Sequence, residues 1–246
     1  MDVELKEISQ WKKVRPSLNE SYTYHEHWKE AIQLFKTRLD RKFFDPLKSI
    51  ILQNQKLGEG FSIVTVQCAL IESLASFRTG YIYKLKIEKN APSFYYTKSK
   101  AMFIDFLHTD LIFINHFYHL NSVNKKILDH PFNAFEFYDS VRCGLMHEAR
   151  TKGAWHINAS SNDDLLGPFI RQEGDKIKLL RTVLHHRLQN SVNQYLTDLQ
   201  SSTSEGLRLR RLFARKPDHL FDIPPDSKFD WWKDENGDAG SKKGSR

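Results

Sequence analysis

Apolar residues recur at helical spacing along most of the chain. Between Trp28 and Leu39, apolar side chains fall at i, i+4, i+7 and i+11, a spacing that predicts one buried face of a helix. Segments of this kind predict helices over residues 3–14, 22–53, 61–78, 98–120, 131–150 and 181–200. We therefore expect a mainly α-helical protein.

Proline and glycine set the expected ends of these helices. The first helix should end before Arg15-Pro16, because a residue that precedes proline avoids the helical region. The second should be interrupted at Pro46 for the same reason. The third follows a turn over residues 57–60 and should stop near Gly80. Irregular chain is expected over 81–97 and a loop over 121–130.

The apolar pattern changes its period after residue 153. Residues 154–159 alternate between apolar and polar, which predicts a strand, and residues 169–180 predict a β-hairpin around a turn that contains Gly174. The expected fold is therefore a helical bundle with a small β-hairpin insertion, at about 154–180, before the last helix.

The periodic pattern ends near residue 200. Residues 201–246 combine a basic run, the pair Trp231-Trp232 and an end rich in Gly, Ser and Lys, a composition that buries little apolar surface. We therefore expect one helical domain over residues 1–200 and a flexible basic and aromatic tail over 201–246.

The composition is that of an ordinary globular protein with a modest basic excess. Of the 246 residues, 40% belong to the hydrophobic set and 27% are charged. Lys and Arg number 37 against 30 Asp and Glu, which gives a formal net charge of +7. This excess is compatible with nucleic-acid binding and does not require it.

The chain has none of the sequence features of a secreted or membrane-spanning protein. Its first residues lack the apolar stretch of a signal peptide, and its two most apolar windows, 61–77 and 101–120, contain charged and polar residues. The two cysteines, Cys68 and Cys143, are too few for a disulfide framework or a zinc site. We therefore expect a cytoplasmic protein without membrane contact, metal or cofactor.

Arg142 and His147 are the candidate catalytic residues. A permanently charged guanidinium can hold a phosphate and an imidazole can move a proton near neutral pH, so this pair suits chemistry on a phosphodiester. Three residues of the same segment are candidate supporting groups: Asp139, Cys143 and Glu148.

The spacing alone does not single out this pair. An Arg followed after four to six residues by a His is expected about twice by chance in this composition. The pattern occurs as Arg142/His147, Arg150/His156 and Arg181/His186. The second pair crosses Gly153 and a change from helix to strand, and the third reads as a solvated helix face, so context favours the first.

On a helical wheel, Arg142 points into the apolar face of its helix. Three polar side chains form an edge beside it: Asp139, Cys143 and His147. This arrangement fits a site at a groove or a subunit interface. It fits equally well a structural ion pair between Arg142 and an acidic residue such as Asp105 or Asp110.

The stretch from Val141 to Glu148 resembles the Arg-x(4–6)-His signature of the HEPN superfamily of small α-helical bundles. The motif on a late helix, a hairpin that starts at Trp155 and a closing helix are similar to one group of stand-alone bacterial members, over about residues 20–200.

The resemblance implies a metal-independent endoribonuclease that acts on single-stranded RNA. It implies that Arg142 and His147 face their copies across a homodimer, and that the protein has a toxin or phage-defence role with an antitoxin or defence partner. Cys143 stands where many members have Asn or Asp. Ala149 stands where toxins silenced by nucleotidyltransferase antitoxins have Tyr.

The alternative is a non-catalytic HEPN-like module that binds RNA, a nucleotide or a protein partner as a dimer. Cys143 and the modest charge favour this alternative, whereas the intact Arg142/His147 pair favours the enzyme.

The predicted tail carries a candidate nucleic-acid-binding cluster. Four arginines lie among Leu209, Leu212 and Phe213: Arg208, Arg210, Arg211 and Arg215. Such a cluster suits RNA phosphates, and it suits equally the solvated end of a frayed helix.

Overall fold

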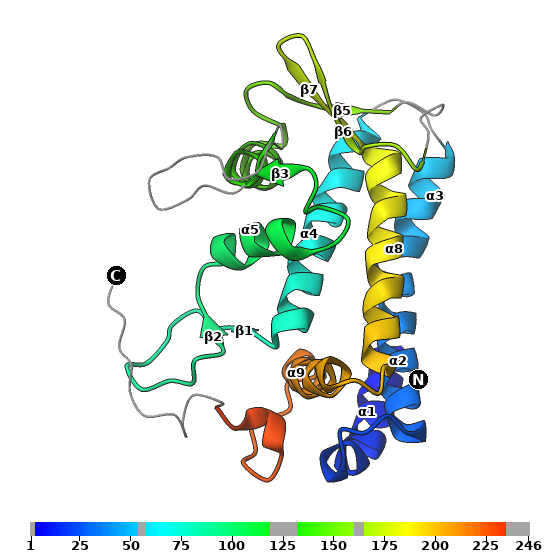
Figure 1. Ribbon diagram of the computed structural model, residues 1–246, viewed down its shortest axis with the longest axis vertical. Coiled ribbons are helices and arrows are strands. Elements are labelled where there is room, and N and C mark those ends of the chain that lie inside the picture. Colours follow the sequence, from blue (N-terminus) through cyan, green and yellow to red (C-terminus); the bar gives the residue numbers. More distant parts are fainter. Residues whose placement is uncertain (1–2, 54–57, 119–131, 160–164, 235–246) are drawn as a thin grey trace. The chain divides into compact units, whose positions relative to one another are not determined.

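The computed structural model of the protein describes residues 3–53, 58–118, 132–159 and 165–234 (Figure 1). Helices predominate and the strands are short, so the fold class is mainly α, as predicted. The chain divides into two compact units. Unit 1 comprises Met1–Lys36, Ser76–Ser99 and Leu196–Arg246, and unit 2 comprises Thr37–Ala75 and Lys100–Tyr195.

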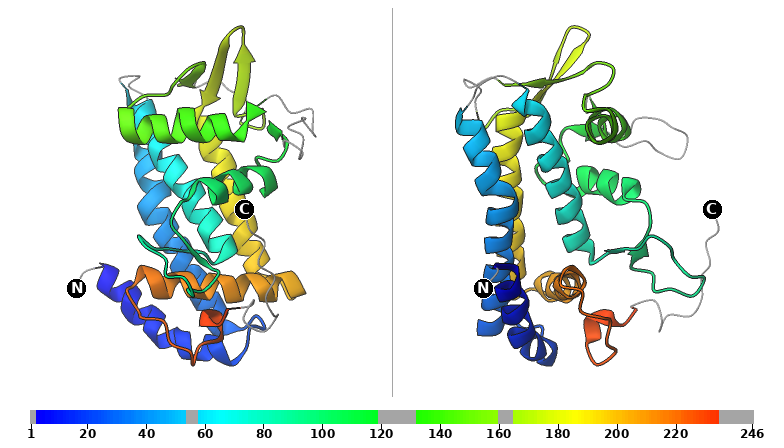
Figure 2. Two further views of the ribbon diagram at one scale, coloured as in Figure 1. Left: turned by 90° about the vertical axis from the view of Figure 1, so that its left-hand side faces the viewer. Right: turned by 180° about the vertical axis from the view of Figure 1, so that it is seen from behind.

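Unit 1 combines helices from the first and the last parts of the described chain. Its elements are α1 (Val3–Glu20), most of α2 (Glu26–Leu39), the two-residue parallel strands β1 (Ile82–Tyr83) and β2 (Tyr95–Tyr96), α9 (Ser204–Leu220) and the 3₁₀ helix η3 (Asp230–Trp232). α1 packs against α9, and both can be followed in Figure 2. The core is aromatic, because the ring of Phe213 contacts those of Trp11, Trp28, Phe35 and Phe77.

Unit 2 is helical with one three-stranded sheet. Its helical elements are the π-helical segment η1 (Asp40–Phe44), α3 (Asp45–Gln53), most of α4 (Glu59–Thr79), α5 (Lys100–Thr109), α6 (Ala134–Glu136), the π-helical segment η2 (Phe137–Cys143), α7 (Gly144–Glu148) and most of α8 (Arg181–Gln200). Its strands are β3 (Phe117–Tyr118), β4 (Phe132–Asn133), β5 (Trp155–Asn158), β6 (Ile170–Glu173) and β7 (Lys176–Leu180). The predicted interruption at Pro46 is wrong, because Asp45 is helical (φ −64°, ψ −46°) and the helix continues from α2 through η1 into α3. The π-helical segment η1 is the local irregularity that precedes the proline.

The β-hairpin predicted around Gly174 is confirmed. β6 and β7 pair antiparallel, with Ile170 opposite Leu179, and Gly174 has a φ of +57°, a conformation that favours glycine. The predicted strand β5 pairs with β7 in parallel, with Trp155 opposite Ile177. The strand order is therefore β5-β7-β6, and α8 follows directly as predicted.

The helix predicted over 98–120 is wrong beyond Thr109, where α5 ends. The carboxylate of Asp110 accepts hydrogen bonds from the backbone N–H of Ile112 (3.0 Å) and from the hydroxyl of Ser191 on α8 (2.8 Å). A side chain that bonds to the nearby backbone competes with the helical pattern, so the chain turns instead of continuing. Residues 119–131, including the predicted loop, lie outside the described residues.

The segment predicted as one helix over 131–150 is not uniform. Its helical part begins at Ala134, where Asn133 accepts a hydrogen bond from the backbone N–H of Phe135 (2.8 Å) and so caps α6. η2 then winds as a π-helix, with more residues per turn than an α-helix. The helical wheel used for Arg142 therefore does not apply over this segment.

α1 runs through Pro16 instead of ending before it. A proline inside a helix removes one hydrogen bond and strains the preceding turn. Contacts on both sides of the proline offset this, because Leu18 is fully buried and Arg15 binds Asp218 of α9. Tertiary packing thus outweighs the local signal.

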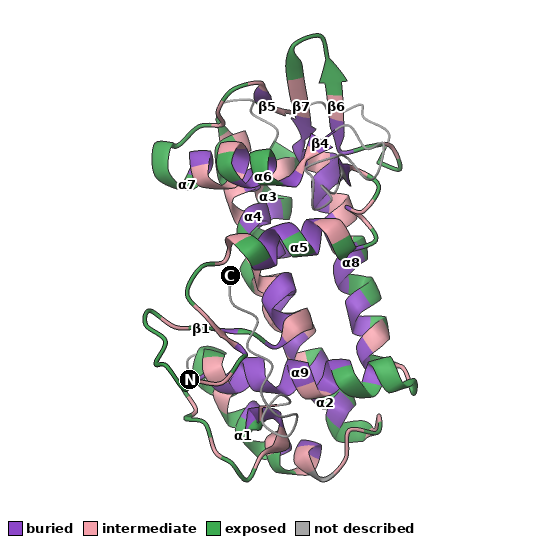
Figure 3. Cartoon of the chain, turned by 60° about the vertical axis from the view of Figure 1, so that its left-hand side comes forward, coloured by how far each residue is buried: buried purple, intermediate pink, exposed green. Residues whose placement is uncertain are grey.

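The prediction of a flexible tail is wrong for the described residues after 203. Thr203 caps α9 by accepting a hydrogen bond from the N–H of Gly206 (3.2 Å), and the helix buries Leu209, Leu212 and Phe213. Much of α9 has the colour of buried residues in Figure 3. This cap, followed by apolar residues at helical spacing, is a signal that the sequence carries. Because α9 belongs to unit 1, the division also differs from one helical domain over 1–200 with a separate tail.

α4 is long and apolar enough to cross a membrane by length and composition. However, 56% of its most apolar window is buried within the structure, as in the core helix of a soluble protein. Its buried Gln67 donates a hydrogen bond to the backbone carbonyl of Arg181 (2.8 Å).

Candidate functional site

η2 carries Arg142, and α7 carries His147 in its last turn. α7 ends at Ala149, whose φ of +55° is left-handed, and the chain then folds back along η2 and α7. The N–H of Lys152 donates to the carbonyl of Ser140 (2.9 Å). Gly144 allows this close approach, because a Cβ at that position would lie 2.6 Å from the carbonyl oxygen of Arg150. The fold-back therefore fixes the end of the helix that carries His147.

Arg142 forms an ion pair with Glu72 of α4. Its Nη2 lies 2.9 Å from Oε2 of Glu72, and the two side chains are 20% and 26% exposed. Burial lowers the pKa of Arg142, but the charge and hydrogen bond of Glu72 more than offset this, so the pKa is raised. The expectation of an ion pair is therefore confirmed, but its predicted partner is wrong, since Asp110 instead accepts from Ser191.

The surroundings of Arg142 include an aromatic ring and two cysteines. Its guanidinium carbon lies 5.4 Å from the centre of the Tyr138 ring, and Cys143 accepts a hydrogen bond from it. Burial raises the pKa of the Cys68 thiol to about 12, although the charge of Arg142 acts in the opposite direction. Cys68 therefore stays protonated near neutral pH and is no nucleophile.

His147 is exposed in the last turn of α7. Within the described parts of the chain, its imidazole has neither a hydrogen bond nor an ion pair. Two of the predicted supporting residues have partners of their own. Asp139 binds Lys100 (2.8 Å), and Glu148 binds Lys152 (2.6 Å), whose hydrogen bond lowers the pKa of that carboxyl. The arrangement thus offers a freely accessible imidazole and a guanidinium anchored on one side.

The predicted basic cluster on α9 is divided between buried and more exposed arginines. Arg210 and Arg215 are buried, and their guanidinium groups donate to backbone carbonyls, including those of Tyr22 and Trp231. Arg211 donates to the carbonyl of Asp230, and exposed Arg208 pairs with Glu205. The structure contradicts the RNA-binding assignment for Arg210 and Arg215, because buried side chains cannot reach a nucleic acid.

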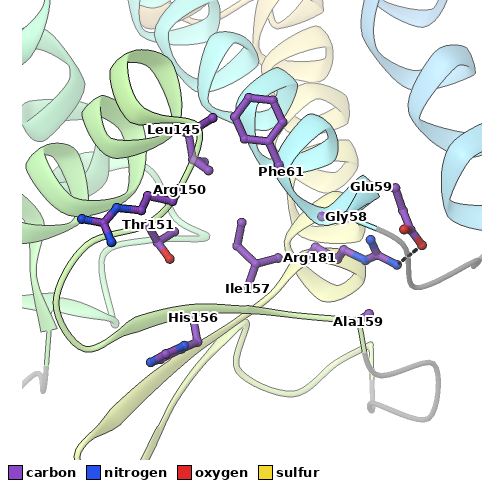
Figure 4. A pocket seen from close by; sticks show the side chains of 12 residues that line it. Gly58, Glu59, Phe61, Leu145, Arg150, Thr151, His156, Ile157, Ala159 and Arg181 are labelled. Atoms are coloured by element: carbon purple, nitrogen blue, oxygen red, sulfur yellow. Dashed lines mark hydrogen bonds and ion pairs between the residues drawn. The ribbon is translucent and has the colours of Figure 1, made fainter.

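Residues of the other two Arg/His pairs line a cavity of about 400 Å³ in unit 2. Arg150 and His156 lie on one side of it, and Arg181 lies on the other, where it forms an ion pair with Glu59 (3.1 Å; Figure 4). His186 is not among the lining residues. The sequence disfavoured Arg150/His156 because that pair crosses a change from helix to strand, and Arg181/His186 because it read as a solvated helix face. The second reading is wrong for Arg181, which is 2% exposed and pairs with Glu59.

No family model, curated protein or solved structure matches this chain. Among the residues that the structure describes, no three His, Cys, Asp or Glu side chains form a group that could hold a metal ion. The function is therefore argued from the chemistry of the site.

Proposed function

We propose that the protein is a metal-independent endoribonuclease of the HEPN type, with His147 and Arg142 as its catalytic residues. The observation that carries this proposal is the contrast within one short segment. His147 is exposed and has no partner among the described residues, while Arg142 is held by Glu72 through one nitrogen and keeps 20% of its side chain exposed.

His147 transfers the proton in the proposed reaction. It takes the proton of a ribose 2′-hydroxyl, or gives a proton to the leaving 5′-oxygen. The 2′-oxygen attacks the adjacent phosphorus and the bond to the 5′-oxygen breaks, which leaves a 2′,3′-cyclic phosphate and a 5′-hydroxyl. Arg142 stabilises the negative charge that develops on the phosphoryl oxygens.

One imidazole cannot act as base and acid in the same step. The proposal therefore includes a homodimer in which two copies of His147 divide these roles on one strand of single-stranded RNA. Phe135 on α6 and Met146 on α7 are exposed, and they provide apolar surface for such contact. A cytoplasmic toxin or defence role, with an antitoxin or defence partner, belongs to the same proposal.

The second candidate is a non-catalytic module that binds RNA, a nucleotide or a protein. The Glu72–Arg142 ion pair favours it, because a guanidinium already neutralised by a carboxylate attracts a phosphate less strongly. Binding without cleavage is the outcome that separates this candidate from the enzyme.

Cleavage of a labelled single-stranded RNA in EDTA tests the proposal. We expect the wild type to cleave, and His147→Gln and Arg142→Lys to cleave at least about 100-fold more slowly. His27→Gln is the matched control, since His27 is an exposed histidine of unit 1 and should leave the rate unchanged. Equal rates for His147→Gln and the wild type would overturn the assignment. RNA binding without cleavage by the wild type would favour the second candidate.

A further inference from the structure

The cavity in unit 2 combines a buried charge with an apolar wall. It measures about 400 Å³, within the range of pockets that hold small molecules. Its lining comes from the start of α4, the end of α7 with the chain after it, β5, and the first residue of α8. The proposed catalytic residues Arg142 and His147 are not among the lining residues.

Arg181 supplies the buried cation of this cavity. The residue is only 2% exposed, and Nη2 of its guanidinium pairs with Oε1 of Glu59. Its Nε is buried and has no hydrogen-bond partner among the described residues. An unsatisfied charged donor is costly in a protein interior, so an acceptor placed here is strongly favoured.

α4 adds positive potential at the same place. This helix begins at Glu59 and spans 21 residues, so the amino end of a long helix lies at the cavity. The N–H of Phe61 already donates to the carbonyl of Gly58 (3.1 Å), and Glu59 lies in the first turn. The partial positive charge of the helix start still favours an anion. Two independent features of the cavity thus select negative charge.

The middle of the cavity is apolar. Phe61, Leu145 and Ile157 point into it between the Arg181 side and the Arg150 side (Figure 4). Gly60 lets α4 approach the sheet, because a Cβ there would lie 2.9 Å from Cγ2 of Ile157. A bare inorganic anion would leave this wall without contacts, whereas an apolar body would cover it.

The charges around the cavity limit the ligand to a single negative charge. The ionised lining groups are Arg181 with its partner Glu59, and Arg150, whose side chain is 75% exposed and lies 3.8 Å from Glu148. Figure 4 shows the Arg150 and His156 side chains turned away from the Glu59–Arg181 ion pair. A dianion close to Arg181 would also face Glu59, so a monoanion fits better.

We infer that this cavity binds a small monocarboxylate with an aryl or alkyl body, its carboxylate toward Arg181 and the start of α4, and its body against Phe61, Leu145 and Ile157. The site is separate from the proposed ribonuclease chemistry and does not depend on it.

Titration with phenylacetate, followed by ligand-observed NMR on the full chain, tests this site. A ligand of this size that fills the cavity should bind with a Kd on the order of 1 mM or tighter. Benzyl alcohol keeps the ring without the charge, and inorganic phosphate keeps a charge without the ring. Both should bind at least about tenfold more weakly than phenylacetate.

Two variants test the charge and the free volume of the cavity separately. Arg181→Gln removes the charge, and Ile157→Phe fills the space while leaving all charges in place. Each should weaken phenylacetate binding at least about tenfold, because binding needs both the cation and the free volume. Lys176→Gln, at an exposed position of β7, removes the same charge outside the cavity and should change the Kd less than about twofold.

Each binding result supports or contradicts a stated part of the inference. Absence of phenylacetate binding by the wild type overturns the inference, as does binding that Ile157→Phe leaves unchanged. Equal affinity for benzyl alcohol would show an apolar cavity without anion selection, and preferential binding of phosphate would show an anion site without the apolar part. If Arg181→Gln fails to fold, Ile157→Phe decides. RNA cleavage by the wild type is measured separately, so either proposal can fail alone.

Discussion

Each unit of the protein contains a carboxylate that holds an arginine, and the two differ in how completely they are satisfied. In unit 1, Asp218 is fully buried and accepts hydrogen bonds from Nε and Nη2 of Arg15 (2.7 and 2.9 Å). The indole N–H groups of Trp11, Trp231 and Trp232 donate to the same carboxylate at 2.8 to 2.9 Å. In unit 2, Glu72 binds Arg142 by one hydrogen bond at 2.9 Å, and both side chains keep contact with solvent.

This difference in hydrogen bonding distinguishes a carboxylate with a structural role from an ion pair that can still bind a ligand. A carboxylate that is buried and saturated with donors has no capacity left for a ligand, and its worth lies in fixing the elements that supply the donors. The Glu72–Arg142 pair is only partly exposed, but its arginine retains unused N–H donors. A second anion can therefore approach it. The presence of an ion pair is therefore poor evidence for or against function. The hydrogen-bond donors that the arginine still has unused are better evidence.

The largest expected effect comes from breaking the saturated carboxylate. Asp218→Asn keeps the shape but removes the charge, and it places an amide donor among N–H donors. We expect a loss of about 3–5 kcal/mol in the free energy of unfolding, because Arg15 is left buried without a counter-charge. Urea unfolding followed by tryptophan fluorescence measures this loss.

The matched control lies four residues further along. Asp222 is exposed and has a φ of +53°, a conformation that Asn also tolerates. Asp222→Asn should change the free energy of unfolding by less than about 0.5 kcal/mol. If Asp218→Asn were equally harmless, the description of Asp218 as a saturated structural carboxylate would be wrong.

A buried histidine gives the next largest effect. Burial lowers the pKa of His185 on α8 to about 4, and its Nδ1 has no hydrogen-bond partner among the described residues. Below its ordinary pKa of about 6.5, the unfolded chain takes up a proton that the native state refuses until pH falls to about 4. Stability should therefore be fully present above pH 6.5 and fall toward pH 4.

His185→Leu should remove this part of the acid sensitivity. Between pH 7 and pH 4.5, the wild type should lose on the order of 2 kcal/mol more than the variant. Urea midpoints at the two pH values measure the difference. Parallel losses in the two proteins would show that another group carries the acid sensitivity.

The Glu72–Arg142 ion pair, which is partly exposed, should contribute less to stability than Asp218. We expect Glu72→Gln to lower the free energy of unfolding by about 1 kcal/mol, since the charges keep solvent contact. A double-mutant cycle with Arg142→Gln isolates the pair, and its coupling energy should also be about 1 kcal/mol. A coupling of 3 kcal/mol or more would make Glu72 the equal of Asp218 and remove the contrast between the units.

The smallest expected effect is that of the proposed catalytic imidazole. Because His147 is exposed and has no partner among the described residues, His147→Gln should change the free energy of unfolding by less than about 0.5 kcal/mol. The same protein preparation is used for the RNA cleavage assay. A stability loss comparable to that of Glu72→Gln would show that His147 has a structural role.

Those parts of the fold that depend on local signals could be predicted from the sequence. The hairpin around Gly174 and helix α8 follow from alternation, glycine and helical spacing within a few residues. The end of α5 could be predicted only in part, because Asp110 accepts one local hydrogen bond from the N–H of Ile112 and one from the hydroxyl of Ser191, 81 residues away. The path of α1 through Pro16 likewise depends on the distant α9.

The candidate site was predictable only in part, for the same reason. The segment with Arg142 and His147 stands out in the sequence, but the choice of Glu72 as partner depends on how η2 winds and where α4 lies. The cavity was missed entirely, since Arg150, His156 and Arg181 reach it from separate elements. The helical tail was a different kind of error, because the cap at Thr203 is a local signal.

The link between Trp11 and Asp218 also sets an order of events during synthesis. These residues are 207 positions apart, and all of unit 2 is encoded between them. At ordinary translation speeds this distance takes on the order of 10–40 seconds. During that time the apolar face of α1 has no partner from α9, so it is open to a chaperone or to another nascent chain. The length of the intervening sequence thus sets the time during which α1 lacks its packing partner α9.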